Sequence, residues 1–315
     1  TLSSSSAASD VYKRQGISQG SVLGLLLFLI YINDLERNIK SNIKFFADDT
    51  MLFSTIENPA VSAADLNYDL NLICQWAHQW KMEFNPDPAK QATEVFFSCK
   101  KASPNHPQLL VNGNAVAKVK DQKHLGLILD QKLSFEKHLN EKITKAKKNV
   151  GVIKHLSKYL PIKTLDQMYK ALVRSHLDYC DIIYHEPSKL NQPPLGLTLT
   201  PLMEKVEKIQ YQAALAITGT WQGTNRSKLY EELGWETLSE RRTCRRILQV
   251  HKIENRKTPS YLREKLPLHR QPGNALSNFR EIRSRTKRHS KTFFPDTIAS
   301  WNIFISHLSK MPTFG

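Results

Sequence analysis

The sequence predicts an α+β fold, in which antiparallel strands and helices make up the first part and helices alone the rest. Three observations carry this prediction. Two short apolar runs flank a tight centre within residues 42–54, the pattern of a β-hairpin. Asn112-Gly113 is the strongest two-residue hairpin signal that a sequence offers. Beyond Asp130 the apolar residues step by three and four, which is typical of helices.

The elements of the first part are predicted from their local patterns. A glycine-punctuated loop over Gly16–Gly24 leads into an apolar helix that ends near Asp34, and Asn58-Pro59 is read as a break in the chain. An amphipathic stripe predicts the next helix. The expected elements are the helix over 66–80 and strands over 94–99, 108–119 (around the Asn-Gly turn) and 124–129.

The second part is expected to be helical to its end. An apolar stripe from Leu139 to Leu160 predicts one helix, whose other positions carry lysines, and a second helix follows Pro161 to about Tyr184. The five tryptophans are read as core residues rather than stacking surfaces. The expected segments are a Pro-rich linker over 186–200, helices over 202–217 (capped by Gly219), 228–233 and 239–255, and a basic region to residue 315.

Net charge points to a polyanionic partner. The 315 residues hold 45 Lys and Arg against 29 Asp and Glu, a net charge of +16. Residues 137–174 hold ten basic and two acidic residues, and residues 241–291 hold sixteen and three. Two readings stay open for both windows: contact with a phosphate backbone, or a solvated helical face. The basic residues favoured for backbone contact are Lys142, Lys145, Lys148, Arg241, Arg242, Arg245 and Arg246.

Several classes of protein are disfavoured. The longest apolar run, Val22–Ile32, is shorter than the roughly 20 residues that cross a bilayer, so no membrane partner is expected. The four cysteines lie far apart and form no C-x-x-C, which disfavours a disulfide scaffold and zinc, and fits a reducing compartment. His176 and Cys180 are one helical turn apart but have no second ligand pair near them in sequence.

Asp48-Asp49 is the pair of residues most suggestive of chemistry. Adjacent residues of a regular strand point to opposite faces, so neighbouring carboxylates serve one site only at a turn or a bulge. Apolar flanks on both sides, from Phe45 to Phe53, place this turn against a core. Two like charges held there cost energy unless a cation neutralises them, and Mg²⁺ prefers oxygen ligands. A solvated surface turn is the competing reading.

Four motifs in a fixed order resemble the reverse transcriptases of non-LTR (LINE-type, jockey-like) retrotransposons. GISQGSVLGLLLFLIYINDL over 16–35 resembles their fourth palm motif, and Phe46-Ala47-Asp48-Asp49 matches the F/Y-A-D-D metal motif. Asn85 and Lys90 resemble N-x-x-K-T, with two extra residues before the lysine, and HLGLILD over 124–130 resembles the primer-grip hairpin. Leu25 stands where the family usually has proline, which costs little at a helix first turn.

The resemblance implies an RNA-directed DNA polymerase with a partial right-hand palm over 16–130, a helical thumb over 131–185 and a basic helical region over 201–315. It implies two Mg²⁺ ions, an RNA template, a DNA primer and dNTP, and an intracellular ribonucleoprotein in cytoplasm and nucleus. Asp48 and Asp49 would be the catalytic metal ligands. Nucleotide and template contacts would come from Ser18, Gln19, Gly20, Phe46, Ala47 and Lys90, and the primer grip from Leu125 and Gly126.

The same resemblance calls for a third carboxylate upstream of the GISQG segment, together with a fingers domain. Residues 1–15 hold nothing like F-x-D-x-x-x-A-F-D, and their Ser/Ala-rich composition predicts a disordered leader that need not be native to the rest of the chain. We therefore expect an N-terminally truncated fragment that is inactive by itself. The alternative is a non-catalytic nucleic-acid-binding remnant. The sequence does not predict the oligomeric state.

Overall fold

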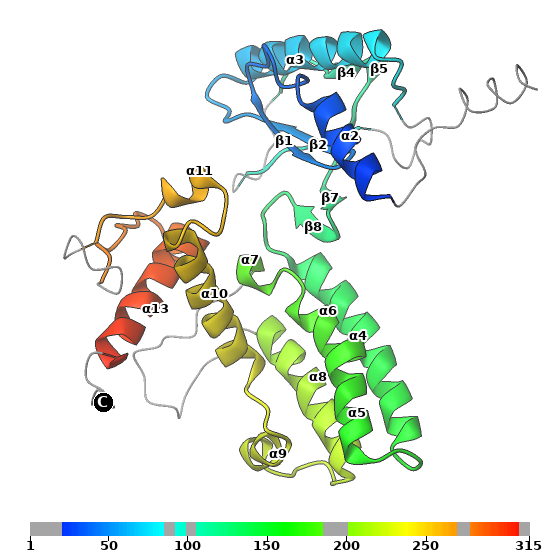
Figure 1. Cartoon of the computed structure of the whole chain (residues 1–315), viewed down its shortest axis with the longest axis vertical. Helices are drawn as coiled ribbons and strands as arrows, with labels where there is room; N and C mark the ends of the chain where they lie inside the picture. The colour runs from blue at the N-terminus through cyan, green and yellow to red at the C-terminus, as the bar shows by residue number, and fades with distance from the viewer. Residues whose placement is uncertain (1–20, 85–91, 99–104, 185–200, 270–277, 309–315) are drawn as a thin grey trace, which may run out of the picture. The chain divides into compact units, whose positions relative to one another are not determined.

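The computed structural model describes residues 21–84, 92–98, 105–184, 201–269 and 278–308 (Figure 1). It divides into two compact units, residues 1–122 and 123–315. The first unit mixes helices with short two-stranded sheets. Among its described residues, the second unit is helical apart from one hairpin and one isolated bridge between His269 and Phe279. The α+β class is therefore confirmed. No helix among the described residues is both long and apolar enough to span a bilayer.

The first unit opens with helix α2, Val22–Ile32, which starts inside the predicted loop because the Ser21 hydroxyl caps it by accepting from Gly24 N–H at 3.1 Å. Strands β1 (Asn42–Phe46) and β2 (Asp49–Phe53) follow as an antiparallel hairpin. Helix α3 (Pro59–Gln79) starts earlier than predicted: Asn58 is its N-cap and Pro59 its first residue, so this dipeptide starts a helix rather than breaking the chain.

A small core joins these elements. Ile32 and Leu35, from either side of Asn33-Asp34, are buried with Ile73 of α3, and Ile43 and Phe45 of β1 pack on them. Two polar contacts fix the arrangement. Trp76 donates its indole N–H to Asp34 at 2.9 Å, and the fully buried Asp69 accepts from the backbone N–H groups of residues 40 and 41 at 2.9 and 2.8 Å.

Two short pairings complete the first unit. Strands β4 (Leu110–Val111) and β5 (Asn114–Ala115) form the predicted hairpin, whose two turn residues Asn112 and Gly113 both have positive φ. Strand β3 (Thr93–Val95) is shorter than predicted and pairs in parallel with β6 (Ala117–Val119), so this part of the fold is not purely antiparallel.

The boundary between the units falls within a hairpin of β7 (Asp121–His124) and β8 (Leu127–Asp130), where we expected one strand. Long helix α4 (Glu136–Leu156) follows. The remaining elements are α5 (Ile162–Met168), the π-helical η2 (Tyr169–Arg174), α6 (Ser175–Asp178), α7 (Asp181–Tyr184), α8 (Pro201–Thr218), α9 (Arg226–Leu233), α10 (Leu238–Glu254), α11 (Ser260–Arg263), α12 (Lys287–Ser290) and α13 (Phe293–Leu308).

One large core spans most of these helices. Leu139, Ala146 and Ile153 of α4 are buried together with apolar residues of η2, α8 and α9. The segments predicted as separate thumb and C-terminal regions therefore share a core. Leu127 of β8 belongs to it too, which is why the boundary between the units falls in β7 and not at Asp130. The linker predicted over 186–200 lies outside the described residues.

Helix α13 lies in the region predicted to be basic and helical, although the sequence did not predict its bounds. Trp301, Ile298 and Ile305 form a second core with Val250 of α10 and with Phe279. Its apolar residues are diluted by polar ones in a basic region, so the periodicity is weak in the sequence.

Candidate functional site

The paired carboxylates lie at the predicted hairpin turn. Phe46 of β1 pairs with Asp49 of β2, which leaves Ala47 and Asp48 as a two-residue turn. Ala47 has a φ of +52°, an unusual conformation for a residue with a side chain. Asp48 lies in the turn and not in the strand, so the strand alternation does not force it to the face opposite Asp49.

The surroundings of this turn differ from the prediction. Asp48 and Asp49 are both exposed, and Phe46 is 63% exposed. The register explains why: Ile43 and Phe45 face the core, whereas Phe46 and Asp49 share the other face of the hairpin. The apolar flanks therefore reflect one packed face and one open face. The turn itself projects into solvent.

Asp48 and Asp49 fit a hard cation by donor type, since carboxylate oxygens are the ligands that Mg²⁺ prefers. The described residues contain no group of three or more His, Cys, Asp or Glu placed to hold a metal ion. Within those residues the turn thus offers two carboxylates. The other predicted nucleotide contacts (Ser18, Gln19, Gly20 and Lys90) lie outside the described residues.

The predicted primer-grip residues form the tip of the β7–β8 hairpin. Leu125 and Gly126 have φ values of +47° and +78°. The Tyr179 hydroxyl donates to the Leu125 carbonyl, and a Cβ on Gly126 would lie 2.9 Å from that hydroxyl oxygen. Sequence reasoning missed Tyr179, which follows α6 and links the hairpin tip to the end of that helix.

Asp130 ends the hairpin and sets the start of α4. Its carboxylate accepts from the backbone N–H groups of Lys132, Ser134 and Phe135, at 3.0, 3.1 and 2.8 Å. Burial alone would raise the pKa of Asp130, but these hydrogen bonds outweigh it and lower the pKa below its ordinary value. The last residue of the HLGLILD motif therefore has a structural role in positioning the lysine helix.

The lysines of α4 are presented to solvent, as predicted. Lys145 and Lys148 are exposed, and Lys142 is half-buried with its ammonium 4.3 Å from the centre of the Tyr179 ring. Burial and then the charge of Lys145 lower the pKa of Lys142. Lys145 forms a one-turn ion pair with Glu141 at 2.6 Å, but both side chains reach solvent and such pairs contribute little.

The arginines of α10 are not a solvent face, which corrects the prediction. Arg242 and Arg246 are each 2% exposed. Arg246 contacts Asp296 at 3.1 Å, Thr297 Oγ1 at 3.0 Å and the Ile182 carbonyl at 2.8 Å. Arg246 thus links α10 to α7 and α13, and the burial of both arginines makes them inaccessible to a phosphate backbone.

The two more exposed arginines of α10 are also paired. Arg241 and Arg245 contact the Asp178 carboxylate at 3.2 and 3.4 Å, and Arg245 contacts Asp181 at 2.9 Å. Asp178 and Asp181 are three residues apart, close to the four-residue spacing of the arginines. The sequence analysis did not predict this internal pairing, for which the spacing is the one available signal.

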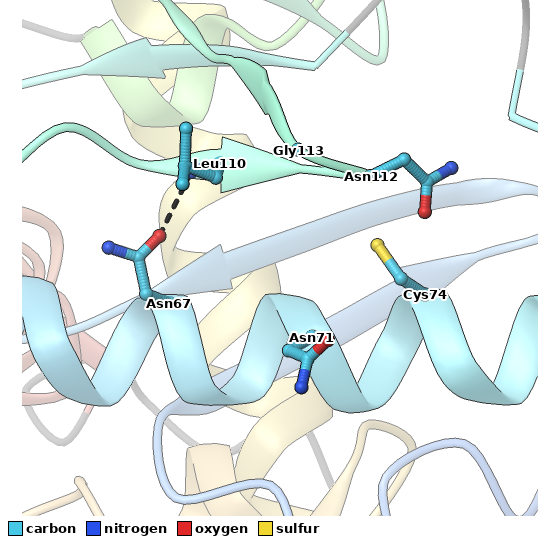
Figure 2. A pocket seen from close by; sticks show the side chains of 6 residues that line it. All are labelled: Asn67, Asn71, Cys74, Leu110, Asn112 and Gly113. Carbon is cyan, nitrogen blue, oxygen red and sulfur yellow. Dashed lines mark hydrogen bonds between the residues drawn. The ribbon is translucent and has the colours of Figure 1, made fainter.

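A pocket of about 490 Å³ lies on the first unit, between α3 and the β4–β5 hairpin (Figure 2). Asn67 holds the two elements together: it accepts from Leu110 N–H at 2.9 Å and donates to the Gln108 carbonyl at 3.0 Å. The pocket is lined by Asn67, Asn71, Cys74, Leu110, Asn112 and Gly113, none of which is a predicted site residue.

Comparison with known proteins bears on these sites. Residues 2–129 match the family described as reverse transcriptase (RNA-dependent DNA polymerase). The match covers the β1–β2 turn and ends at the β7–β8 hairpin. It also includes most of the segment predicted as a leader. No solved structure gives a significant match.

Curated relatives agree with the family match. The chain is 27% identical over 236 residues to the probable RNA-directed DNA polymerase from transposon X-element of Drosophila melanogaster, covering 71% of this chain and 24% of the relative. It is 28% identical over 132 residues to the RNA-directed DNA polymerase from mobile element jockey of the same fly, covering 39% and 14%. The chain thus spans a quarter or less of the length of these relatives. The resemblance to non-LTR retrotransposon reverse transcriptases is confirmed.

Proposed function

We propose that this chain carries part of the polymerase centre of a non-LTR retrotransposon reverse transcriptase. Its first unit would be palm, and α4 with the β7–β8 hairpin would be thumb and primer grip. The reaction would join a dNTP to a primer 3′-hydroxyl on an RNA template. The observation that carries the proposal is the Phe46-Ala47-Asp48-Asp49 turn, found on a hairpin within the segment that matches the reverse transcriptase family.

Asp48 and Asp49 would hold the divalent metal. Magnesium bound there supplies stabilisation of the charge on the attacking and leaving oxygens. The exposed turn leaves both carboxylates within reach of a primer end and a triphosphate. Phe46, on the same face as Asp49, offers an apolar surface beside the carboxylates on which a sugar or base can rest.

Lys142, Lys145 and Lys148 of α4 would hold the template–primer backbone. The charges of Lys145 and of Lys123 in β7 lower the pKa of Lys142, and the charges of Lys142 and Lys145 lower the pKa of His176. Repulsion within such a group is relieved when a phosphate binds among its members. The Tyr179 hydroxyl fixes the primer-grip tip next to the same group, because the Tyr179 ring is the one over which Lys142 lies.

Primer extension on an RNA template with Mg²⁺ tests the proposal. The comparison is between the unsubstituted sequence and the Asp48→Ala, Asp49→Ala variant. Each is assayed alone and joined to the preceding segment of the jockey polymerase. Extension that needs both aspartates supports the proposal. A variant with Glu57→Gln and Glu83→Gln controls for loss of exposed negative charge in the same unit. Extension that survives loss of Asp48 and Asp49 contradicts it.

A non-catalytic nucleic-acid-binding protein is the second candidate. It is favoured by residues 142–165, which hold seven lysines and no carboxylate. This candidate predicts salt-sensitive binding of template–primer with no extension in any of these formats. The two candidates therefore predict different outcomes for primer extension and the same outcome for template–primer binding.

A further inference from the structure

The far end of the helical bundle in the second unit carries a surface that the polymerase proposal does not use. Helix α4 starts beside the β7–β8 hairpin, where Ile128 N–H donates to His138 at 3.4 Å. Its 21 residues extend about 30 Å from there. Figure 1 shows α4 and α8 ending at the same end of the bundle, and Leu156, Leu160 and Ile217 pack into one core there. We call this end the distal tip.

Three lysines at the distal tip are exposed. Lys154 and Lys158 lie in the last turn of α4 and in the turn that follows it, and Lys163 lies in the first turn of α5. None of the three is in an ion pair within the described part of the chain, and Asp166, the carboxylate closest to Lys163 in sequence, pairs with Lys170. Their charge is therefore available to an anionic ligand.

Two exposed aromatic residues follow the helices that end at the distal tip. Tyr159 is 72% exposed and follows α4, with its ring 6.3 Å from that of His155. Trp221 is 84% exposed and lies in the loop between α8 and α9. The sequence predicts a core position for this tryptophan, and the structure contradicts it. Trp235 and Trp301, by contrast, are 8% and 2% exposed.

The loop that carries Trp221 is built to hold its backbone. The Trp221 carbonyl accepts from the Thr224 hydroxyl at 2.8 Å, and the Thr224 carbonyl accepts from Tyr211 at 2.8 Å. Gly223 N–H in turn donates to the Tyr211 hydroxyl at 3.2 Å. The indole is therefore exposed on a loop whose backbone is fixed by hydrogen bonds. A ligand that covers the indole does not have to order this loop first.

We propose that the distal tip binds single-stranded nucleic acid, with unpaired bases stacking on Tyr159 and Trp221 and phosphates contacting Lys154, Lys158 and Lys163. Exposed aromatic rings together with lysines suit single-stranded nucleic acid, because each unpaired base can stack on a ring and each phosphate carries a negative charge. A duplex has its bases already stacked and gains only from the lysines. The site is separate from the primer grip and does not depend on the polymerase proposal.

The test is titration of the full chain with a fluorescently labelled oligo-thymidylate at low and moderate salt. The Tyr159→Ala, Trp221→Ala variant is expected to bind at least roughly tenfold more weakly. Trp221→Phe should keep more affinity than Trp221→Leu, because only the aromatic ring stacks. The Lys154→Gln, Lys158→Gln, Lys163→Gln variant should bind more weakly and with a shallower dependence on salt.

Matched controls separate this site from other effects. Tyr261→Ala removes an exposed aromatic ring elsewhere in the second unit, and Lys252→Gln, Lys257→Gln, Lys265→Gln removes three other exposed lysines. Both should bind oligo-thymidylate as the unsubstituted chain does.

Unchanged affinity in the tip variants overturns the proposal. So does equal loss in Trp221→Phe and Trp221→Leu, which would indicate a surface for an apolar protein partner. Failure here leaves binding of template–primer duplex through Lys142 and Lys145 intact, so the two proposals fail separately.

Discussion

Helices α4 and α10 each lie in one of the two basic windows of the chain, and their basic residues have opposite environments. The α4 lysines face water, and those beyond Glu141 have no acidic neighbour in sequence up to Asp166. The α10 arginines 242 and 246 are buried, and the pairs around them reach Asp178, Asp181 and Asp296 on three other helices. The chemistry of the side chains fits this division, because the planar arginine fork suits buried pairs and lysine is a strongly hydrated charge.

The difference shows that counting charges in a window does not measure a surface. Both windows are strongly positive in sequence, yet the α10 arginines are buried or paired with carboxylates, whereas Lys145 and Lys148 of α4 are exposed. The two sets of basic residues differ in whether carboxylates from distant parts of the chain pack against them in the folded protein. That information resides in the tertiary packing of α10 on α7 and α13.

The largest expected effect on stability comes from removing the buried ion pair between Arg246 and Asp296. Arg246→Ala leaves Asp296 buried without its cation and several carbonyls without a donor, so the free energy of unfolding should fall by about 3–5 kcal/mol. Urea unfolding measures it. Arg246→Met combined with Asp296→Leu should recover most of the loss, because no buried charge is left. A loss below about 1 kcal/mol for Arg246→Ala would show that the arginine is solvated.

A pH dependence should follow from the same pair. Burial raises the pKa of Asp296 to about 6, although Arg246 lowers it in part. The folded state therefore holds this proton more tightly than the unfolded chain, whose carboxyl titrates near its ordinary value of 3.8. Between these two values the unfolded state binds fewer protons, so this carboxyl makes stability fall as pH rises from about 4 to 6.

Subtracting an Asn variant isolates that contribution. The free energy of unfolding of the unsubstituted chain minus that of Asp296→Asn should decrease by roughly 1–3 kcal/mol over this interval and stay level above it. Chemical unfolding at a series of pH values measures it. A difference that rises with pH would mean that the ion pair outweighs burial.

The smallest effects on stability are expected on α4. Lys142→Gln with Lys145→Gln should change the free energy of unfolding by less than about 0.5 kcal/mol, because Lys145 is exposed and Lys142 only half-buried. The same variant should bind template–primer roughly tenfold more weakly. Fluorescence anisotropy measures the affinity. A variant that loses both template–primer binding and its folded structure would show that these lysines stabilise the fold.

Local signals in the sequence predicted much of the fold. The Asn112-Gly113 turn, the Asp48-Asp49 hairpin and the helix stripe from Leu139 to Leu160 each depend on neighbouring residues, and each is present. The Asn58-Pro59 dipeptide is ambiguous, because its two residues serve equally as a break and as a helix start.

Features that depend on long-range packing were not predictable in this way. Arg242 is buried close enough to Tyr184 and Glu207 for their charges to affect its pKa, and both residues are distant in sequence. The exposure of Trp221 depends on a loop held by Tyr211 of another helix. The open face beside Asp49 follows from which side of a two-stranded hairpin finds a core, and alternation alone does not decide that.

The most direct test of the contrast between α4 and α10 is the salt dependence of template–primer binding in two variants. One carries Lys142→Gln, Lys145→Gln and Lys148→Gln, and the other Arg241→Gln and Arg245→Gln. We expect the slope of log affinity against log salt to become shallower by up to about 0.9 per lysine removed, and the arginine variant to keep the original slope while it is folded. A slope that is unchanged in the lysine variant and reduced in the arginine variant would contradict the contrast.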